Sequence, residues 1–354
     1  MRTPSPHLNL PRTLRRELVC IETATPPRLA VQSVELPRPG NGEVLVRVQA
    51  TSVNPIDVKR AAGYGRRLLG LKGAASVPLV LGNDVAGIVE STGAGATRFA
   101  QGQSVFGLLG TGRGGGAHAS HVVVPQDFLL PAPDDADPTA LAVLPYSFTT
   151  MWLALRSTGI TAGNARGARV LINGANGGLG RLALQLLHPR GSEITAICGK
   201  GQVQVALDLG AQVAVEHRPG CIESLPSDFD AVLNFAHWDD DASLASRLGP
   251  RGLGHATTVH PLLANFDRLG WLGGALASHR DRSRIRRVVA SRAPNARYAW
   301  TIFKPDRKAL EALAEGVRAR RVALPVGIAQ SFDNAIAAFD HVSGGRPGRA
   351  VLLP

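Results

Sequence analysis

Cysteine, lysine and aromatic residues are scarce in this chain of 354 residues. The three cysteines, Cys20, Cys198 and Cys221, have the spacing of neither a disulfide framework nor a thiolate metal site. Aromatic residues make up 5% of the chain, and no uninterrupted run of about 18 apolar residues predicts a membrane span. These absences favour a globular protein of a reducing compartment, and we expect a cytoplasmic location.

Because only 5 of the 39 basic residues are lysines, arginine carries the formal net charge of +12. The densest run, from Ser278 to Arg297, has seven arginines and one aspartate. It has no interleaved aromatic residues on which bases could stack. We therefore expect a solvated helical face or loop, with an arm for an anionic substrate as the alternative, and no nucleic-acid partner.

The first 17 residues contain four arginines and no acidic residue before Glu17. In this they resemble a transit peptide, but they lack the apolar segment of a secretory signal. The interpretation that we favour is a flexible tail at 1–17.

The pattern of apolar residues changes along the chain. From Leu18 to Val143, short alternating runs separated by glycine and proline predict an antiparallel β domain. After a helical stretch that starts at Leu144, apolar runs alternate with helical segments, which is typical of βαβ units on a parallel sheet. The strands predicted there are 168–174, 193–198, 211–217, 231–236 and 255–260. Beyond them, helices at 306–321 and 333–345 and a closing strand at 349–354 leave that sheet again.

The segment VLINGANGGLG ends a predicted strand and opens a predicted helix. Ala175, Gly177 and Gly180 occupy the positions of a G-x-G-x-x-G motif, with Gly178 as an additional glycine. Such glycines allow a sharp turn, close approach of the backbone to a pyrophosphate, and packing of helix on strand. The exposed N–H groups at the helix start would then face the phosphates. The sequence therefore predicts a dinucleotide site.

The residues after the next strand select the dinucleotide. An NAD site places an acidic residue about 20 positions beyond the glycines, to hold the ribose 2′-hydroxyl group. Here the segment AICGKGQ offers the Gly199 N–H group and the Lys200 ammonium group instead. Because a cation attracts a 2′-phosphate and a carboxylate repels it, NADPH is favoured over NADH. His217 is a candidate for a second contact with that phosphate.

The order of these parts resembles the medium-chain dehydrogenase/reductase superfamily. The likeness is carried by SVNPIDVKRAAGYG, PLVLGNDVAGIVE, LPYSFTTMWLAL, VLINGANGGLG, LLANFDRLG and YAW. Within the superfamily it is most similar to the zinc-independent quinone oxidoreductase branch, of the mitochondrial reticulon-4-interacting protein 1 type. The resemblance implies an α/β fold class with a GroES-like β-rich catalytic domain at 18–145 and 306–354. A Rossmann domain with a doubly wound parallel sheet would be inserted at 146–305.

The resemblance also implies which residues form the site. The positions of a catalytic zinc site match Asn54, Asn83 and Tyr146, which supply no thiolate or imidazole, so we expect no metal. The cofactor-binding residues would be Thr150, Ala175, Asn176, Gly177, Gly178, Leu179, Gly180, Gly199, Lys200, His217, Asn234 and Val259. Arg349 stands where the family's C-terminal motif has lysine, and Gly345 where it has histidine, which leaves that contact open.

Without a metal, hydride transfer from NADPH needs a conjugated electrophile, which is a quinone or an α,β-unsaturated carbonyl compound. The resemblance assigns Asn54 to the nicotinamide or the substrate carbonyl. Tyr64 and Tyr146, with Lys59 behind them, are candidates for the donor that stabilises the developing oxyanion. Solvent is the alternative proton source.

Two local clusters are interpreted as structural. His118 and His121 would point to opposite faces of a strand. Asp239, Asp240 and Asp241 would form a helix N-cap and its first turn.

The function predicted is therefore that of a zinc-independent, NADPH-dependent oxidoreductase acting on a small conjugated carbonyl compound or quinone, as a homodimer by analogy with the family. An enoyl thioester reductase and a cofactor-binding interaction protein without turnover are the alternatives.

Overall fold

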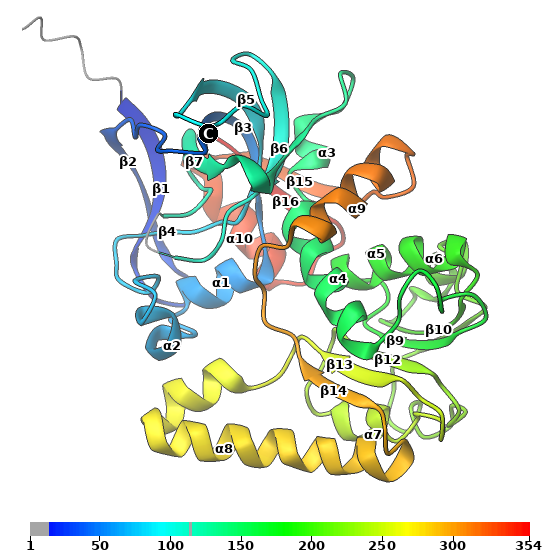
Figure 1. Ribbon diagram of the computed structural model, residues 1–354. Coiled ribbons are helices and arrows are strands. Elements are labelled where there is room, and N and C mark those ends of the chain that lie inside the picture. The colour runs from blue at the N-terminus through cyan, green and yellow to red at the C-terminus, as the bar shows by residue number, and fades with distance from the viewer. Residues whose placement is uncertain (1–13, 113–114) are drawn as a thin grey trace, which may run out of the picture.

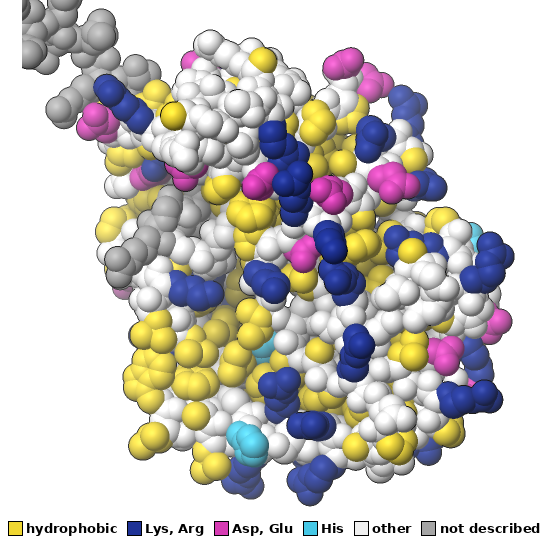
Figure 2. Space-filling view, in the orientation of Figure 1, with side chains coloured by type: hydrophobic (Ala, Val, Ile, Leu, Met, Phe, Trp, Pro, Cys, Tyr) yellow, Lys and Arg dark blue, Asp and Glu magenta, His cyan; other side chains and the backbone are white. Residues whose placement is uncertain are grey.

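The computed structural model describes residues 14–112 and 115–354, which form two lobes side by side (Figure 1). One lobe is rich in β-strands and combines segments from both ends of the chain. The other lobe holds a parallel sheet covered by helices. Figure 2 shows that arginine and lysine side chains are spread over the face presented there, whereas acidic side chains are fewer.

The β-rich lobe contains a sheet with the order β15-β16-β3-β5-β6-β8, in which β7 also pairs with β3, and a smaller sheet with the order β2-β1-β4. Strand β16 pairs with β15 in parallel and with β3 antiparallel, so the end of the chain closes the sheet that the first strands build. The strands are β1 (Leu14–Glu22), β2 (Arg28–Glu35), β3 (Glu43–Val53), β4 (Leu79–Val80), β5 (Asp84–Thr92), β6 (Ser104–Leu108), β7 (His121–Pro125), β8 (Leu129–Pro131), β15 (Val326–Ser331) and β16 (Arg349–Leu353).

The second lobe contains a sheet with the order β11-β10-β9-β12-β13-β14, in which every neighbouring pair is parallel. This is the doubly wound order, in which the direction of winding reverses beside the first strand, β9. The carboxyl ends of the central strands thus border a crevice. The strands are β9 (Arg169–Asn173), β10 (Glu193–Cys198), β11 (Val213–Glu216), β12 (Ala231–Asn234), β13 (Gly254–Thr257) and β14 (Arg297–Trp300).

The helices cover the sheets and connect the lobes. They are α1 (Pro55–Ala61), α2 (Arg66–Gly70), α3 (Pro138–Leu141), α4 (Pro145–Thr158), α5 (Gly178–Leu187), α6 (Val203–Asp208), α7 (Asp241–Ala245), α8 (Leu262–Arg292), α9 (Arg307–Arg318) and α10 (Ala335–Ser343), with short 3₁₀ turns at Gln126–Phe128, His188–Arg190 and Phe332–Asn334. Within the described ranges, no helix combines the length and the apolar character that crossing a membrane would require.

Helix α4 lies where the two lobes meet. Its side chains Phe148 and Met151 are fully buried, in a hydrophobic core that continues to Phe106 of β6 and to Ile172 of β9. A proline at the first position favours this helix start, and Gly159 ends the helix in the left-handed conformation that glycine adopts without strain. The lobes therefore share one core rather than a thin polar contact.

The α/β fold class predicted from the sequence is confirmed, and β10 has the predicted bounds, 193–198. The edge strand β14 was not predicted. Most of the arginine-rich run, expected to be a solvated helical face or loop, belongs to the long helix α8. Of the predicted tail, residues 1–13 lie outside the described residues, and Leu14 to Glu17 belong to β1.

Replacing Phe148 by alanine tests whether α4 joins the two lobes. A fully buried phenylalanine contributes both transfer free energy and packing, so we expect the free energy of unfolding to fall by about 3–5 kcal/mol in urea denaturation. The control Leu207→Ala changes a side chain that is 36% exposed and should shift stability by roughly 0.5 kcal/mol or less. Equal effects of the two variants would contradict the shared core.

Candidate active site

The glycine-rich segment forms a tight bend between β9 and α5. Gly174 has φ +82°, and a Cβ on Gly180 would lie 2.3 Å from the Gly174 carbonyl oxygen. Helix α5 therefore packs on the end of β9 only because Gly180 has no side chain. Gly177 is the N-cap residue and no side-chain hydrogen bond caps the helix. The first N–H groups of α5 are thus left for an acceptor from outside, such as a phosphate.

Asn176 ties this bend to the turn after β10. Its Nδ2 atom donates to the Gln202 carbonyl oxygen at 3.0 Å, whereas its Oδ1 atom is buried and has no partner among the described residues. Ala175 is buried beside it, and Leu179 is half-buried. A buried acceptor without a donor indicates a place where a further group completes the hydrogen bonding.

A small cavity of about 230 Å³ lies next to this bend, at the carboxyl ends of β9 to β12. Gly199 and Lys200 after β10, and His217 after β11, line it together with Gly174 and His237. The structure thus brings together residues that the sequence assigned to the adenosine end of a dinucleotide. Asp240 also holds the His217 ring in place, because the Nε2 atom of His217 lies 2.9 Å from a carboxylate oxygen of Asp240.

One nearby carboxylate was not anticipated from the sequence. Glu216, the last residue of β11, accepts a hydrogen bond of 3.0 Å from the N–H group of Gly201. It reaches the turn that follows β10 from a neighbouring strand, so counting along the chain from the glycines does not find it. The turn therefore carries an ammonium group and a carboxylate together.

A second group of polar side chains is buried at the amino end of β5. The Asp84 carboxylate accepts hydrogen bonds from Ser52 Oγ, from Asn54 Nδ2 at 2.8 Å and from the Tyr146 backbone N–H at 2.5 Å. Burial raises the pKa of Asp84 to about 6, although these donors and the Arg349 guanidinium act in the opposite direction. We call Ser52, Asn54, Asp84 and Arg349 the Asp84 network.

Arg349 extends this network toward the glycine bend. One terminal nitrogen donates to Asn54 Oδ1, and Nη1 lies 3.1 Å from the position that a Cβ on Gly178 would take. Its Nε atom is buried and has no partner among the described residues. A guanidinium group with unused donors thus stands at the first residue of α5, next to the uncapped N–H groups.

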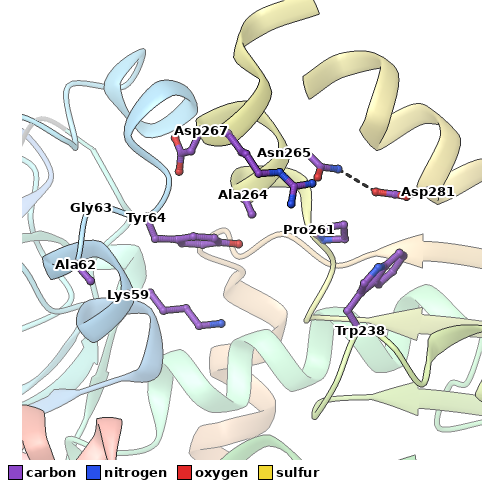
Figure 3. A pocket seen from close by; sticks show the side chains of 11 residues that line it. Lys59, Ala62, Gly63, Tyr64, Trp238, Pro261, Ala264, Asn265, Asp267 and Asp281 are labelled. Carbon is purple, nitrogen blue, oxygen red and sulfur yellow. Dashed lines mark hydrogen bonds between the residues drawn. The ribbon is translucent and has the colours of Figure 1, made fainter. Parts of the chain in front are cut away.

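A larger cavity, of about 740 Å³, lies between the α1–α2 segment and the start of α8. Figure 3 shows Lys59 and Tyr64 on one side of it and Trp238 and Pro261 on the other. The Lys59 Nζ atom lies 5.6 Å from the centroid of the Tyr64 ring. An aromatic ring, a hydroxyl group and an ammonium group therefore face a space wide enough for a planar organic molecule.

The two carboxylates that line this cavity already accept hydrogen bonds from other groups of the protein. Asp267 accepts hydrogen bonds from the N–H groups of Gly65 at 2.5 Å and Arg67 at 3.1 Å, so α8 caps the start of α2. Asp281 accepts one of 2.9 Å from Asn265, the dashed line in Figure 3. Burial and the charge of Asp267 raise the pKa of Tyr64 above its ordinary value.

The four candidate catalytic residues thus fall into two pairs. Tyr64 and Lys59 line the large cavity, but Asn54 is fully buried and its amide is taken up by the Asp84 network. The Tyr146 ring packs at a tilt against Phe303, with the ring centroids 4.3 Å apart, and Tyr146 is not among the residues that line the cavity.

Three of the predicted cofactor residues point to internal partners. Thr150 donates its hydroxyl to the Tyr146 carbonyl oxygen at 2.8 Å, as a helix back-bond. Asn234 is fully buried and donates to Asp241 at 2.9 Å. Val259, half-buried after β13, donates its N–H to Thr257 Oγ1 at 3.3 Å.

The two clusters interpreted as structural differ in outcome. His118 is buried with its Nε2 atom 3.0 Å from the Ser52 carbonyl oxygen, whereas His121 starts β7 and is half-buried.

Asp240 and Asp241 do stand at the N-cap and first turn of α7, but no side chain caps that helix. Asp241 instead accepts hydrogen bonds from Tyr298 at 2.8 Å and Asn234, with the His255 Nε2 atom at 2.9 Å. These carboxylates therefore anchor side chains at the strand ends rather than capping the helix.

Sequence reasoning missed Asp84, Asp267 and Trp238. Asp84 had a signal, because it is a lone carboxylate inside the apolar run PLVLGNDVAGIVE. Asp267 and Trp238 had none, since they reach the cavity only after distant segments pack together.

Comparison with known proteins agrees with this arrangement. Residues 40–134 match the alcohol dehydrogenase GroES-like domain. A solved structure of the quinone oxidoreductase from Coxiella burnetii superposes with a TM-score of 0.80 at 20% identity, covering 97% of this chain and 100% of that one. The fold and these matches define a GroES-like domain joined to a Rossmann-type sheet.

The chain belongs to the medium-chain dehydrogenase/reductase superfamily, in the group that includes NAD(P)H oxidoreductase RTN4IP1. The mitochondrial protein of that name from Danio rerio is 30% identical over 324 residues, which cover 88% of this chain and 83% of the relative. The chloroplast envelope quinone oxidoreductase homolog of Arabidopsis thaliana is 31% identical over 210 residues, which cover 58% of this chain and 62% of that protein.

The expectation of a cytoplasmic location is wrong on this comparison. The relatives at 30% identity over most of the chain are named mitochondrial. The scarcity of cysteine, on which the expectation rested, does not distinguish one reducing compartment from another.

The raised pKa of Asp84 predicts a specific pH dependence of stability. A carboxyl group with a pKa near 6 in the folded state and 3.8 as its ordinary value takes up its proton first in the folded state. Protonation of Asp84 therefore raises the free energy of unfolding as the pH falls from 7 toward 4. This contribution is lost as the pH rises through 6. We expect the wild type to gain stability relative to Asp84→Asn over that range, in urea denaturation at several pH values. A difference between the two proteins that does not vary with pH would contradict the buried carboxyl group.

Proposed function

We propose that this chain is an NADPH-dependent reductase that delivers a hydride to a quinone or an α,β-unsaturated carbonyl compound without a metal ion. The observation that carries the proposal is the 740 Å³ cavity, which has an aromatic wall and a hydroxyl donor and lies between the two lobes. The 230 Å³ cavity and the glycine bend provide a separate place for the phosphates and adenosine of a cofactor.

The residues present fit a dinucleotide phosphate. The α5 N-terminus lacks a side-chain cap, the Arg349 Nε atom is buried without a partner in the described chain, and Lys200 borders the small cavity. These groups would hold the pyrophosphate and the 2′-phosphate through backbone N–H groups and charge-assisted hydrogen bonds. When bound, NADPH supplies the hydride. The chain's own residues orient it and shape the space for the acceptor.

The residues at the zinc positions of the superfamily do not fit that metal. Asn54 and Asn83 offer neutral amides, and the Asn83 Nδ2 atom already donates to the Leu109 carbonyl oxygen at 3.0 Å. The Arg349 guanidinium donates to Asn54 and places a fixed positive charge where a dication would bind. No cluster of three or more His, Cys, Asp or Glu residues in the described part of the chain is arranged to hold a metal ion. This donor set supports reduction without a Lewis acid.

We assign Tyr64 as the donor to the developing oxyanion. Burial raises its pKa above the ordinary value of 10, at which the hydroxyl is already protonated at neutral pH, and the hydroxyl points into the cavity in Figure 3. The Lys59 ammonium lies next to the ring and stabilises negative charge in the same space. Asn54 and Tyr146 become positioning residues, which hold Asp84 and Arg349 through an amide and a backbone N–H.

Lys200 provides a test of cofactor choice. Because an ammonium–phosphate pair is lost, we expect Lys200→Ala to lower kcat/KM for NADPH about tenfold or more and to change that for NADH by less than about twofold. The control Lys308→Ala removes an exposed lysine of α9 and should leave both values unchanged. A wild type that prefers NADH and is weakened by Glu216→Gln would instead assign Glu216 to a ribose hydroxyl group.

Tyr64 provides the test of the reaction. Steady oxidation of NADPH is expected with a simple benzoquinone or an enone, and Tyr64→Phe should lower kcat by about 100-fold while the Kd for NADPH stays the same. The matched variant Tyr146→Phe, which removes a hydroxyl outside the cavity lining, should lose less than about threefold.

The electrophile panel also separates the alternatives. Turnover confined to an enoyl thioester would replace the quinone by that substrate. Binding of NADPH without oxidation by any electrophile would indicate an interaction protein.

A further inference from the structure

Helix α8 is a helical hairpin. Its two arms are joined at Gly270, which has φ 72° and ψ −168°. Across the hairpin, a Cβ on Gly274 would lie 2.7 Å from Phe266 Cα, and Asn265 Nδ2 lies 3.3 Å from Ser278 Oγ. The close approach at Gly274 and the buried Asn265 hold the two arms together, and Figure 1 shows them below α2 as a short yellow coil and the longer yellow-to-orange helix labelled α8.

The tip of this hairpin exposes large apolar side chains. Leu272 is 90% exposed and Leu276 is 61% exposed, and Leu269 and Trp271 are each nearly half exposed. Leu71, directly after α2, is 69% exposed, and α2 packs on the hairpin through Gly65 and Asp267. We call Leu269, Trp271, Leu272 and Leu276 the apolar tip. Figure 2 shows hydrophobic side chains gathered over this corner of the molecule. So many exposed apolar side chains on one element indicate a surface that is covered in use.

A row of unpaired arginines continues from the apolar tip along the second arm. The arginines at 280, 282, 284, 286 and 287 are all exposed, and none of them forms an ion pair within the described residues. At helical spacing, Leu272 and Leu276 share a face with Arg280 and Arg287. The single acidic residue of the run, Asp281, faces inward to Asn265. Arg284 lies on the same side of the helix as Arg280 and Arg287, whereas Arg282 and Arg286 lie to the other side of the leucines. We call Arg280, Arg284 and Arg287 the arginine row.

We propose that the apolar tip and the arginine row dock this protein on an anionic membrane surface. Leucine and tryptophan side chains at the tip enter the boundary between headgroups and acyl chains, and the arginines lie along the lipid phosphates. This is attachment at the surface and requires no membrane span. The positive charge of the arginine row favours an anionic surface, because no carboxylate among the described residues forms an ion pair with these arginines.

The same charges disfavour the other occupants. In a symmetric contact with a second copy, each row would need acidic residues opposite it, and Asp281 is already used. A nucleic acid would pair with the arginines but would leave the leucines of the tip in water.

Docking there has a consequence that rests on the proposed function. The first arm of the hairpin supplies Ala264, Asp267 and Arg268 to the wall of the 740 Å³ cavity. A docked hairpin brings that wall to the lipid surface, where lipid-soluble quinones are concentrated.

Flotation with vesicles tests the docking without any turnover. Vesicles of phosphatidylcholine with about 30% phosphatidylglycerol should carry the protein, whereas pure phosphatidylcholine should not. Retention should weaken at about 1 M salt, where the Debye length falls to about 3 Å. The double variant Leu272→Ser/Leu276→Ser and the triple variant Arg280→Gln/Arg284→Gln/Arg287→Gln should each bind at least tenfold more weakly.

Matched controls separate the location of the patch from overall charge and hydrophobicity. Leu207→Ser removes an exposed leucine elsewhere, and Arg156→Gln/Arg251→Gln/Arg318→Gln removes three exposed arginines elsewhere. Both should float like the wild type. Lipids brominated in the acyl chain should quench tryptophan fluorescence in the wild type but not in Trp271→Phe.

Three results would overturn the proposal: no flotation with anionic vesicles, equal loss in the patch and control variants, or a dimer in light scattering that only the Leu272→Ser/Leu276→Ser variant abolishes. The leucine variant should still reduce a water-soluble quinone at the wild-type rate in the absence of lipid. Loss of docking and failure of the proposed reaction are thereby distinguished.

Discussion

The backbone at the bend between β9 and α5 approaches itself so closely that it leaves no room for a side chain. A Cβ on Gly180 would meet the Gly174 oxygen at 2.3 Å and Ala175 Cα at 2.5 Å. This constraint lets α5 begin directly after the end of β9, so that its uncapped N–H groups lie at the carboxyl end of that strand. The position of this helix start determines where the phosphates of a dinucleotide can lie. The functions proposed for the two cavities depend on that position.

The last strand connects this bend to the rest of the molecule. Strand β16 pairs with β3, and Arg349 at its start joins Asn54 to the first residue of α5. A guanidinium group beside the buried Asp84 carboxyl balances a charge that burial alone disfavours. The cation also binds Asn54, one of the positions that the family resemblance matches to a catalytic zinc site.

The sequence predicted best what depends on neighbouring residues. The apolar run predicted the bounds of β10, and the glycines predicted the position of the bend, because strand periodicity and turn chemistry are local properties. Residues separated by long stretches of chain were harder to place. Asn54 and Arg349 are 295 positions apart, so the amide predicted to face the substrate is instead engaged inside the protein. Glu216 likewise reaches the Lys200 turn from another strand. The α8 hairpin escaped prediction because its reversal occurs at a single glycine, Gly270, without a proline or a polar loop.

The central claim is that the bend and its neighbouring cations bind a phosphorylated nicotinamide dinucleotide. Calorimetric titration of the unmodified chain with NADPH, and separately with NADH, tests it most directly. We expect one NADPH to bind per chain, with a Kd at least about tenfold lower than that of NADH, as one additional charge-assisted contact implies. Absence of heat with either compound, or tighter binding of NADH, would contradict the account.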